Sequence, residues 1–243
     1  MLGLGSSLTT PDCIKWDPSL RDLKLTIWLT ARAADLTLDG TAITTWTDRI
    51  SGLAYTQATA NRKPAWSAAN QTVTFAISPN ADYLVEASTP VILDTDSTGW
   101  TIAWYGTSTD WNNTDQAFMG DAGGNNDFFR HNSGAETLSI KADGQTRTFT
   151  LTSPTALEDS TYYHIMLVCQ TDGAMVLYIN NVAQTDTETL GTTKDFEIDQ
   201  ISGKNTSSQT LDGTMKEIMV FKSPLGEDDR QGCYEYMIRG HYE

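Results

Sequence analysis

Apolar and polar residues alternate along much of the chain, and this pattern predicts β-strands rather than helices. Strand-like runs rich in Thr, Val, Ile, Trp and Tyr are separated by dipeptides suited to tight turns, among them Asp143-Gly144, Asn180-Asn181 and Asp212-Gly213. The best strand candidates are Leu25–Leu29, Thr72–Ala76, Trp100–Tyr105, Leu138–Ala142, Thr146–Leu151, His164–Gln170, Met175–Ile179 and Lys216–Phe221. The pattern therefore predicts an antiparallel all-β protein.

The faces of these runs indicate two stacked sheets. Trp100–Tyr105 and His164–Cys169 carry bulky residues on both faces, so we expect central strands covered on both sides. Thr146–Leu151 alternates instead, and one of its faces should meet water. Helical spacing is convincing only near the C-terminus, where an acidic first turn precedes apolar residues, and it predicts one short helix over about 225–239.

Two segments follow from this pattern. Residues 1–22 show no periodicity and contain prolines, so we interpret them as an N-terminal arm held by its own domain or by a neighbour. Residues 23–243 form one sandwich domain, a size that is ordinary for an all-β fold.

Charge and composition exclude several partners. The net charge of −15 leaves no basic field for nucleic acid or anionic lipid. No apolar run approaches the roughly 18 residues that cross a bilayer, and the first ten residues lack the pattern of a signal peptide, so we expect neither membrane insertion nor the usual export route. Three widely spaced cysteines indicate no zinc site and no disulfide framework, which favours synthesis in a reducing cytoplasm.

Several short motifs follow one another along the chain in a fixed order. A strand at Leu25–Ala31 is followed by Trp46–Gly52, which is similar to a W-x-D-x-S-G turn lengthened by one residue. Ala81–Leu84 is similar to a motif that ends in D-Y-L at the start of a strand. Farther along the chain, Tyr162–Ile165 is similar to a W-H-x-V motif and Leu177–Asn181 to an L-Y-V-N-G motif. Together these stretches resemble the laminin-G-like, concanavalin A-like jelly-roll superfamily over residues 23–243. Tyr163 and Asn181 depart from the tryptophan and glycine of those motifs.

The resemblance implies a two-sheet antiparallel jelly-roll sandwich, whose members serve as lectins, glycanase domains, adhesion modules and virion components, so function must come from a site. The glucanase branch carries an E-x-D-x-E-type strand with paired carboxylates. Glu197 and Asp199 resemble its first half, but Ile201 occupies the position of the acid/base carboxylate. We therefore interpret this strand as structural and expect no catalytic residue and no enzyme activity.

Other enzyme classes are also disfavoured. A sialidase needs a tyrosine nucleophile, an arginine cluster and repeated aspartate boxes, and the sequence has only scattered arginines and no clear box. A serine hydrolase needs a G-x-S-x-G turn for its nucleophile, and the sequence has none. The three histidines lie in unrelated parts of the sequence and do not indicate a catalytic triad.

Calcium is the one cofactor that the sequence suggests. Loops with Asp, Asn and Gly supply the hard oxygen ligands that Ca²⁺ prefers, a recurrent arrangement in jelly rolls of this superfamily. The first candidate loop contains Asp121, Asn125, Asn126 and Asp127. Asp94–Gly99 is a second candidate that starts like an EF-hand loop but has Tyr105 at its twelfth position. Polar turns without a metal are the alternative in both places.

Glycan binding would use an aromatic platform beside hydrogen-bonding side chains. The candidate residues are Trp111, Asn112, Asn113, Phe129 and Arg130, on predicted loops. Loop aromatics also fill sheet edges and interfaces, which is the competing interpretation.

The sequence thus favours a non-enzymatic virion structural protein of a tailed phage: a capsid decoration, cement or other exposed accessory protein with a lectin-like fold. It would be made in the host cytoplasm and located in the virion, with capsid or tail proteins and host-surface glycans as partners and a homo-oligomer as a further option. Leu2, Leu4 and Trp16 would dock the arm on the particle. A free carbohydrate-binding module is the alternative, and a glycoside hydrolase is less favoured.

Overall fold

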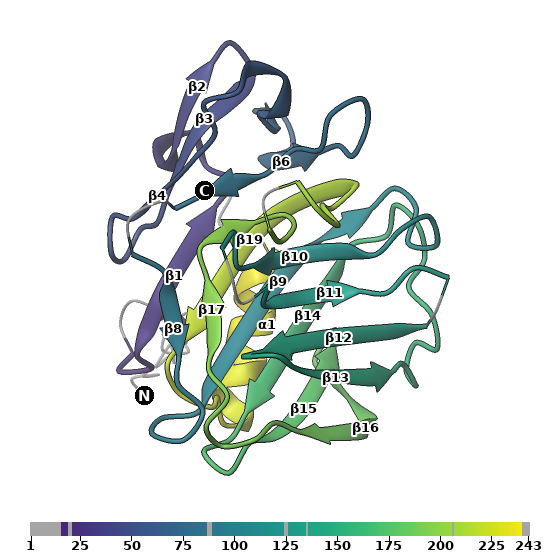
Figure 1. Ribbon diagram of the computed structural model, residues 1–243. Coiled ribbons are helices and arrows are strands. Elements are labelled where there is room, and N and C mark those ends of the chain that lie inside the picture. Colours follow the sequence, from purple (N-terminus) through teal and green to yellow (C-terminus); the bar gives the residue numbers. More distant parts are fainter. Residues whose placement is uncertain are drawn as a thin grey trace, which may run out of the picture.

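The protein is a curled antiparallel β-sheet structure with one helix (Figure 1). A computed structural model describes residues 16–18, 21–86, 89–123, 126–134, 136–205 and 207–239. Within these ranges, no helix combines the length and apolar character needed to cross a membrane.

The strands follow one another closely along the chain. They are β1 (Leu25–Thr30), β2 (Leu36–Asp39), β3 (Ala42–Thr47), β4 (Ala54–Thr56), β5 (Ala65–Ser67), β6 (Thr72–Phe75), β7 (Leu84–Val85), β8 (Val91–Leu93), β9 (Trp100–Ser108), β10 (Gln116–Gly120), β11 (Phe128–His131), β12 (Thr137–Ala142), β13 (Gln145–Thr150), β14 (Tyr163–Cys169), β15 (Ala174–Ile179), β16 (Val182–Thr189), β17 (Phe196–Ile198), β18 (Gln200–Ile201) and β19 (Gly213–Phe221). Short 3₁₀ turns cover Ala33–Asp35 and Ala60–Arg62, and helix α1 is Glu227–Arg239.

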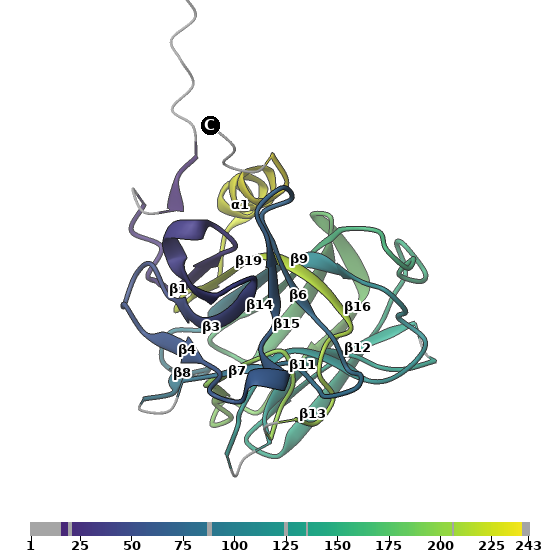
Figure 2. The ribbon, with the colours of Figure 1, turned by 90° about the horizontal axis from the view of Figure 1, so that it is seen from above.

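Most strands belong to one continuous sheet that folds back into two layers. The back layer runs β1-β19-β9-β14-β15-β16, and the front layer runs β7-β18-β10-β11-β12-β13. In Figure 1 the front layer faces the viewer, and α1 lies behind β9; Figure 2 shows α1 on the outer side of β9, β14 and β19.

Two hydrophobic clusters hold these layers together. The larger lies between the layers and contains the fully buried rings of Trp46, Trp100 and Trp104. The smaller lies between the back layer and α1, where Met166, Met219 and other strand residues meet Cys233, Tyr236 and Met237 of the helix. Burial of this kind, worth roughly 25 cal/mol per Å² of apolar surface, explains why the central strands β9 and β14 are apolar on both faces.

The sequence prediction of an all-β jelly roll with one C-terminal helix is confirmed. All eight candidate runs contain or form strands, and the predicted helix is α1. The prediction of a tight turn at Asp212-Gly213 is wrong, because Gly213 begins β19 and its φ lies outside the left-handed region. A Cβ at Gly213 would stand 2.0 Å from the carbonyl oxygen of Thr107, so this glycine permits close strand approach instead.

The W-x-D-x-S-G-like stretch has a clear structural role. Asp48 is buried, and its Oδ1 accepts the backbone N–H of Trp28 at 2.6 Å while its Oδ2 accepts that of Ser51 at 2.8 Å. One carboxylate thereby fixes the turn after β3 and ties it to β1, which explains why an aspartate is needed there.

Candidate functional site

An acidic cluster lies where the end of β10 meets β17 and β18. Asp121 follows β10 directly, Glu197 lies in β17, and Asp199 separates β17 from β18. One carboxylate oxygen from each of the three lies within 4.8 Å of the other two, and Asp121 is only 2% exposed. Strand pairing creates this proximity, because Asp199 donates its backbone N–H to the carbonyl oxygen of Gly120 at 3.1 Å.

Backbone N–H groups hold two of these carboxylates in place. Asp121 accepts the N–H of Gly123 at 2.5 Å on Oδ1 and the N–H of Asn126 at 2.9 Å on Oδ2. Asp199 accepts the N–H of Ala122 at 2.5 Å on Oδ1. The backbone N–H groups of Ala122, Gly123 and Asn126 therefore face these two carboxylates.

Burial and like charges raise the pKa of two carboxyl groups here, those of Asp199 and Asp127. The pKa of Asp199 is raised to about 6, chiefly by burial, with further contributions from Asp121 and Glu197. Burial also raises the pKa of Asp127 to about 6, and the charge of Asp121 adds to this effect. A divalent cation with a preference for oxygen ligands would relieve the crowding of negative charge, so the cluster fits Ca²⁺ chemically.

The predicted calcium loop contributes to this cluster only in part. Asp121 belongs to it, whereas the Asp127 carboxylate accepts the backbone N–H groups of Asp143 at 3.0 Å and Glu197 at 3.1 Å. Asn126 contributes a backbone N–H to Asp121, and Asn125 lies outside the described residues. Glu197 and Asp199, considered at first only as half of a glucanase strand, complete the set. Their i, i+2 spacing, which places residues on one side of an extended segment, is the sequence signal that could have identified them as metal ligands.

A polar cavity opens beside the front layer. Its volume is about 610 Å³, and it is lined by side chains from the 77–81 segment, the loop before β10, the turn after β11 and the segment before β19: Ile77, Ala81, Asn113, Thr114, Asp115, Ser133, Ser207, Gln209 and Thr210. Most of these side chains carry amide, hydroxyl or carboxylate groups. Such a lining suits a ligand rich in hydroxyl groups.

Arg130 holds part of this lining in position. Its Nη1 lies 2.6 Å from both Asp115 Oδ2 and Gln209 Oε1, and its Nε donates to Asn132 Oδ1 at 3.0 Å. Gln209 Nε2 in turn donates to Asp115 Oδ2 at 3.0 Å. These charge-assisted hydrogen bonds orient two cavity side chains before any ligand arrives.

The five predicted glycan-binding residues lie in different environments in the structure. Asn113 lines the cavity, Asn112 is exposed, and Arg130 supports the lining. Trp111 is 1% exposed and Phe129 0% exposed, and both belong to the core between the layers. Neither ring offers a face to a saccharide in this structure. The reason is that both side chains point into the core, where the rings of Trp111 and Phe129 each contact the Phe118 ring edge to face.

A smaller cavity does present an aromatic ring. It measures about 470 Å³ and is lined by Ala69, Asn70, Tyr162 and Lys216. The ammonium of Lys216 lies 4.9 Å from the centre of the Tyr162 ring. Sequence reasoning assigned Tyr162 only to a family motif and did not single it out as a site.

The predicted docking residues are only partly described. Leu2 and Leu4 lie outside the described residues. Trp16 packs on α1, with its ring centre 5.5 Å from that of Tyr236 and its Nε1 3.4 Å from Asp229 Oδ1. This part of the arm is thus held by its own domain.

The two-layer antiparallel jelly roll with one C-terminal helix defines a lectin-like fold. The sequence profile of the concanavalin A-like lectin/glucanases superfamily matches residues 80–229, more than half of the chain. The chain belongs to this superfamily. No curated protein matches it.

Solved structures with the same fold are distant in sequence. Trypanosoma rangeli sialidase is 12% identical with a TM-score of 0.54, over 87% of this chain and 32% of the sialidase. The binding domain of Paraclostridial Mosquitocidal Protein 1 is 11% identical with a TM-score of 0.57, over 87% of this chain and 52% of that domain. The receptor-binding domain of botulinum neurotoxin type G is 11% identical with a TM-score of 0.53, over 87% and 51%. This chain therefore spans a third to a half of these proteins and shares their fold.

Proposed function

We propose that this protein is a non-catalytic, lectin-like module that binds a carbohydrate in the polar cavity beside the front layer. The observation that carries the proposal is the cavity itself, about 610 Å³ and lined mainly by polar side chains, on a fold of the lectin/glucanase superfamily. Two of the similar solved structures are binding domains, one from Paraclostridial Mosquitocidal Protein 1 and the other the receptor-binding domain of botulinum neurotoxin type G, which supports a recognition role.

The lining side chains offer complementary hydrogen-bonding groups. The amides of Asn113 and Gln209 each combine a donor with an acceptor, and the hydroxyl of Ser133 does both. Asp115, held by Arg130, accepts from sugar hydroxyls. Groups that are already oriented lose less entropy when they bind, which favours recognition of a rigid ligand such as a sugar ring.

Calcium bound at the acidic cluster would support this function by stabilising the neighbouring loop. Asp121, Glu197 and Asp199 would hold the ion, and the ion would neutralise their crowded charge. Because Ala122, Gly123 and Asn126 already donate their N–H groups to this cluster, the bound ion would stabilise the loop between β10 and β11.

Absence of catalysis is part of the same proposal. Ile201 stands where a glucanase strand of the E-x-D-x-E type needs its acid/base carboxylate, and it is fully buried in the core between the layers. The strand therefore lacks a side chain that could act as the acid/base group at that position.

The more specific virion assignment remains a prediction with its own test. If the protein is a virion component made in the host cytoplasm, it should sediment with particles at a fixed stoichiometry in a density gradient. Recovery only as free protein would contradict that assignment and leave the carbohydrate-binding proposal intact.

The cavity proposal is tested with a matched pair of amide deletions. Asn113→Ala removes an exposed amide from the polar cavity, whereas Asn70→Ala removes an exposed amide from the smaller cavity. On a glycan array followed by calorimetry, we expect Asn113→Ala to weaken binding about five- to tenfold, the effect of one or two lost hydrogen bonds, and Asn70→Ala to leave it unchanged. Equal binding by wild type and Asn113→Ala, with loss in Asn70→Ala, would move the site to the smaller cavity.

A further inference from the structure

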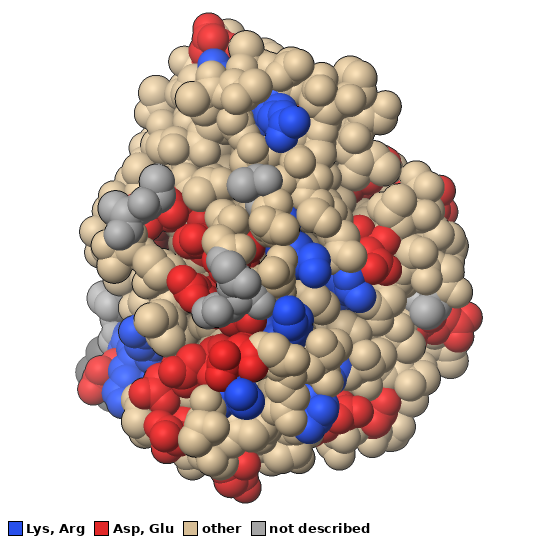
Figure 3. All heavy atoms as spheres, viewed as in Figure 1, with Lys and Arg blue, Asp and Glu red and all other residues tan. Residues whose placement is uncertain are grey.

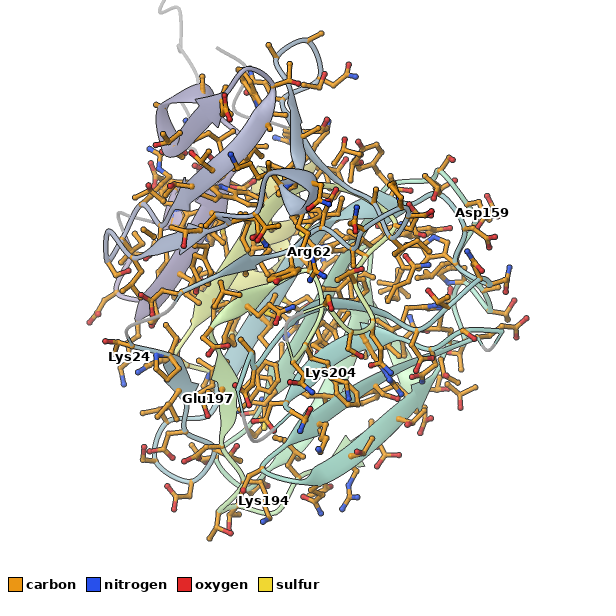
Figure 4. All side chains as sticks on the ribbon, turned by 45° about the horizontal axis from the view of Figure 1, so that its top comes forward. Lys24, Arg62, Asp159, Lys194, Glu197 and Lys204 are labelled. Carbon is orange, nitrogen blue, oxygen red and sulfur yellow. The ribbon has the colours of Figure 1, made fainter. Side chains whose placement is uncertain are left out.

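Three cationic side chains converge on the outer face of the front layer, although the chain carries a net charge of −15. They are Arg130 in β11, Lys141 in β12 and Lys204 in the turn after β18, and we call them the cationic cluster. Figure 3 shows Lys and Arg side chains gathered near the middle of this face, with Asp and Glu side chains beside them. In Figure 4 Lys204 lies near the middle of the view, whereas Lys24 and Lys194 lie toward its margin.

Strand register places the cluster on the outside of the sheet. Successive residues of a strand point to opposite faces, and Phe129 lies in the core, so Phe128 and Arg130 lie on the outer face. Lys141 is the register partner of Phe128 and shares that face.

A single aromatic ring joins two of the cations. The Arg130 guanidinium carbon lies 4.3 Å from the centre of the Phe128 ring, and the Lys204 ammonium lies 4.6 Å from it. The ring attracts both cations through its quadrupole but neutralises neither.

The two cations differ in their counter-charges. Arg130 pairs with Asp115 at 2.6 Å. Among the described residues, no carboxylate oxygen lies within ion-pair distance of the Lys204 ammonium. Burial lowers the pKa of Lys204, and the nearby positive charges of Arg130 and Lys141 lower it further, while the charge of Asp115 partly opposes them.

The cluster is continuous with the polar cavity. Gln209 and Asp115 line the cavity and contact Arg130 directly. Lys204 is bridged to Ser208 within the same turn, whose Ser207 and Gln209 also line the cavity. A ligand in the cavity therefore needs only a short extension to reach the cationic cluster.

We propose that the cationic cluster binds the carboxylate or sulfate group of an acidic saccharide whose uncharged part occupies the polar cavity. This inference rests on the proposed function and narrows its ligand to anionic glycans. The negative surface of the rest of the protein disfavours unspecific adsorption of polyanions, so their binding requires a local site of this kind.

The experiment compares polymers that differ only in charge. Polygalacturonate is paired with methyl-esterified polygalacturonate, and dextran sulfate with dextran, in affinity electrophoresis at physiological ionic strength. The full chain should retain at least one acidic polymer more strongly than its neutral partner. Lys204→Gln and Lys141→Gln should each weaken that retention about tenfold, the loss of a charge-assisted hydrogen bond. Lys24→Gln, the same change on an exposed lysine away from the cluster, should leave it unchanged.

Other results would contradict either the cationic cluster or the proposed function. Equal retention of acidic and neutral polymers, or an equal loss in Lys24→Gln, overturns the cationic cluster as a subsite but leaves carbohydrate binding in place. The proposed function fails separately, if Asn113→Ala leaves the binding of every retained polymer unchanged. Far-ultraviolet circular dichroism of each variant confirms that the compared proteins are folded.

Discussion

The carboxyl group of Glu217 is buried between the back layer and α1. Its Oε1 accepts the indole N–H of Trp28 at 2.6 Å, and Arg49 stacks on that indole with its guanidinium carbon 4.5 Å from the ring centre. Burial raises the pKa of Glu217 to about 7, and the Trp28 hydrogen bond and the charges of Arg32 and Arg49 only partly oppose it. Folding therefore favours the protonated form of this side chain.

Replacing Glu217 by glutamine should change how stability depends on pH. Because the folded pKa of about 7 lies above the unfolded value, the native state binds more protons between roughly pH 4.5 and 7, and the wild type loses stability as the pH rises through this window. Glu217→Gln cannot titrate and keeps an acceptor for Trp28. Urea unfolding at pH 5 and pH 8 should show the variant gaining about 1–3 kcal/mol on the wild type at the higher pH. A constant difference at both values would contradict this.

Calcium should stabilise the protein through the acidic cluster. With Ca²⁺ at about 100 times its dissociation constant, mass action adds about 2.7 kcal/mol and raises the melting temperature, and a chelator reverses the change. Asp199→Asn should abolish the shift, since it removes one of the three clustered carboxylates. Asp96→Asn, in the other candidate loop, is the matched control and should retain the shift. Loss of the shift only in Asp96→Asn would move the site to that loop.

Helix α1 packs against the segment before β1 most closely at Gly232. A Cβ on Gly232 would stand 2.2 to 2.5 Å from Cδ1, Cγ and Nε1 of Trp16, so the indole fits only because the helix has a glycine there. Arg21 adds an ion pair to Asp229 at 2.6 Å on the same helix. Glycine lowers helix propensity by about 1 kcal/mol relative to alanine, so this contact comes at a local cost.

A double-mutant cycle tests the contact between Trp16 and α1. Gly232→Ala alone should destabilise the protein by about 1–3 kcal/mol, because the rigid base of the indole must move. In a Trp16→Ala background the same change should become neutral or stabilising, because only the gain in helix propensity remains. Urea unfolding of the four proteins gives the coupling, and strict additivity would show that Trp16 does not pack there in solution.

The fold was predictable from the sequence, because the features that set it are local. Alternation in runs such as Thr146–Leu151, the double-sided apolar strands and the acidic first turn of α1 are each visible within ten residues or so. Short strands such as β4 and β8 were missed, since three residues carry no period. The turn predicted at Gly213 failed because close strand approach, a tertiary requirement, also selects glycine.

The candidate sites were predictable only in pieces. Asp121 and Asn113 were singled out by residue type, but Asp121 meets Glu197 and Asp199 only because β10 pairs with β18, far along the chain. Trp111 and Phe129 were misplaced because an aromatic residue beside polar ones suits a core as well as a binding platform, and only packing decides between them. Register between β11 and β12 likewise brings Lys141 to Phe128.

The position of α1 determines how the molecule would be displayed on a support. The helix and the Trp16 segment lie together on the outer side of the back layer (Figure 2). Arg130 and Lys141 of the cationic cluster belong to the opposite layer, and the polar cavity lies beside it. A tether joined through either of these segments would therefore turn every cavity outward. Copies arrayed in this way would present their cavities in parallel to a surface with repeated sugars, so that weak individual contacts would combine into strong multivalent adhesion.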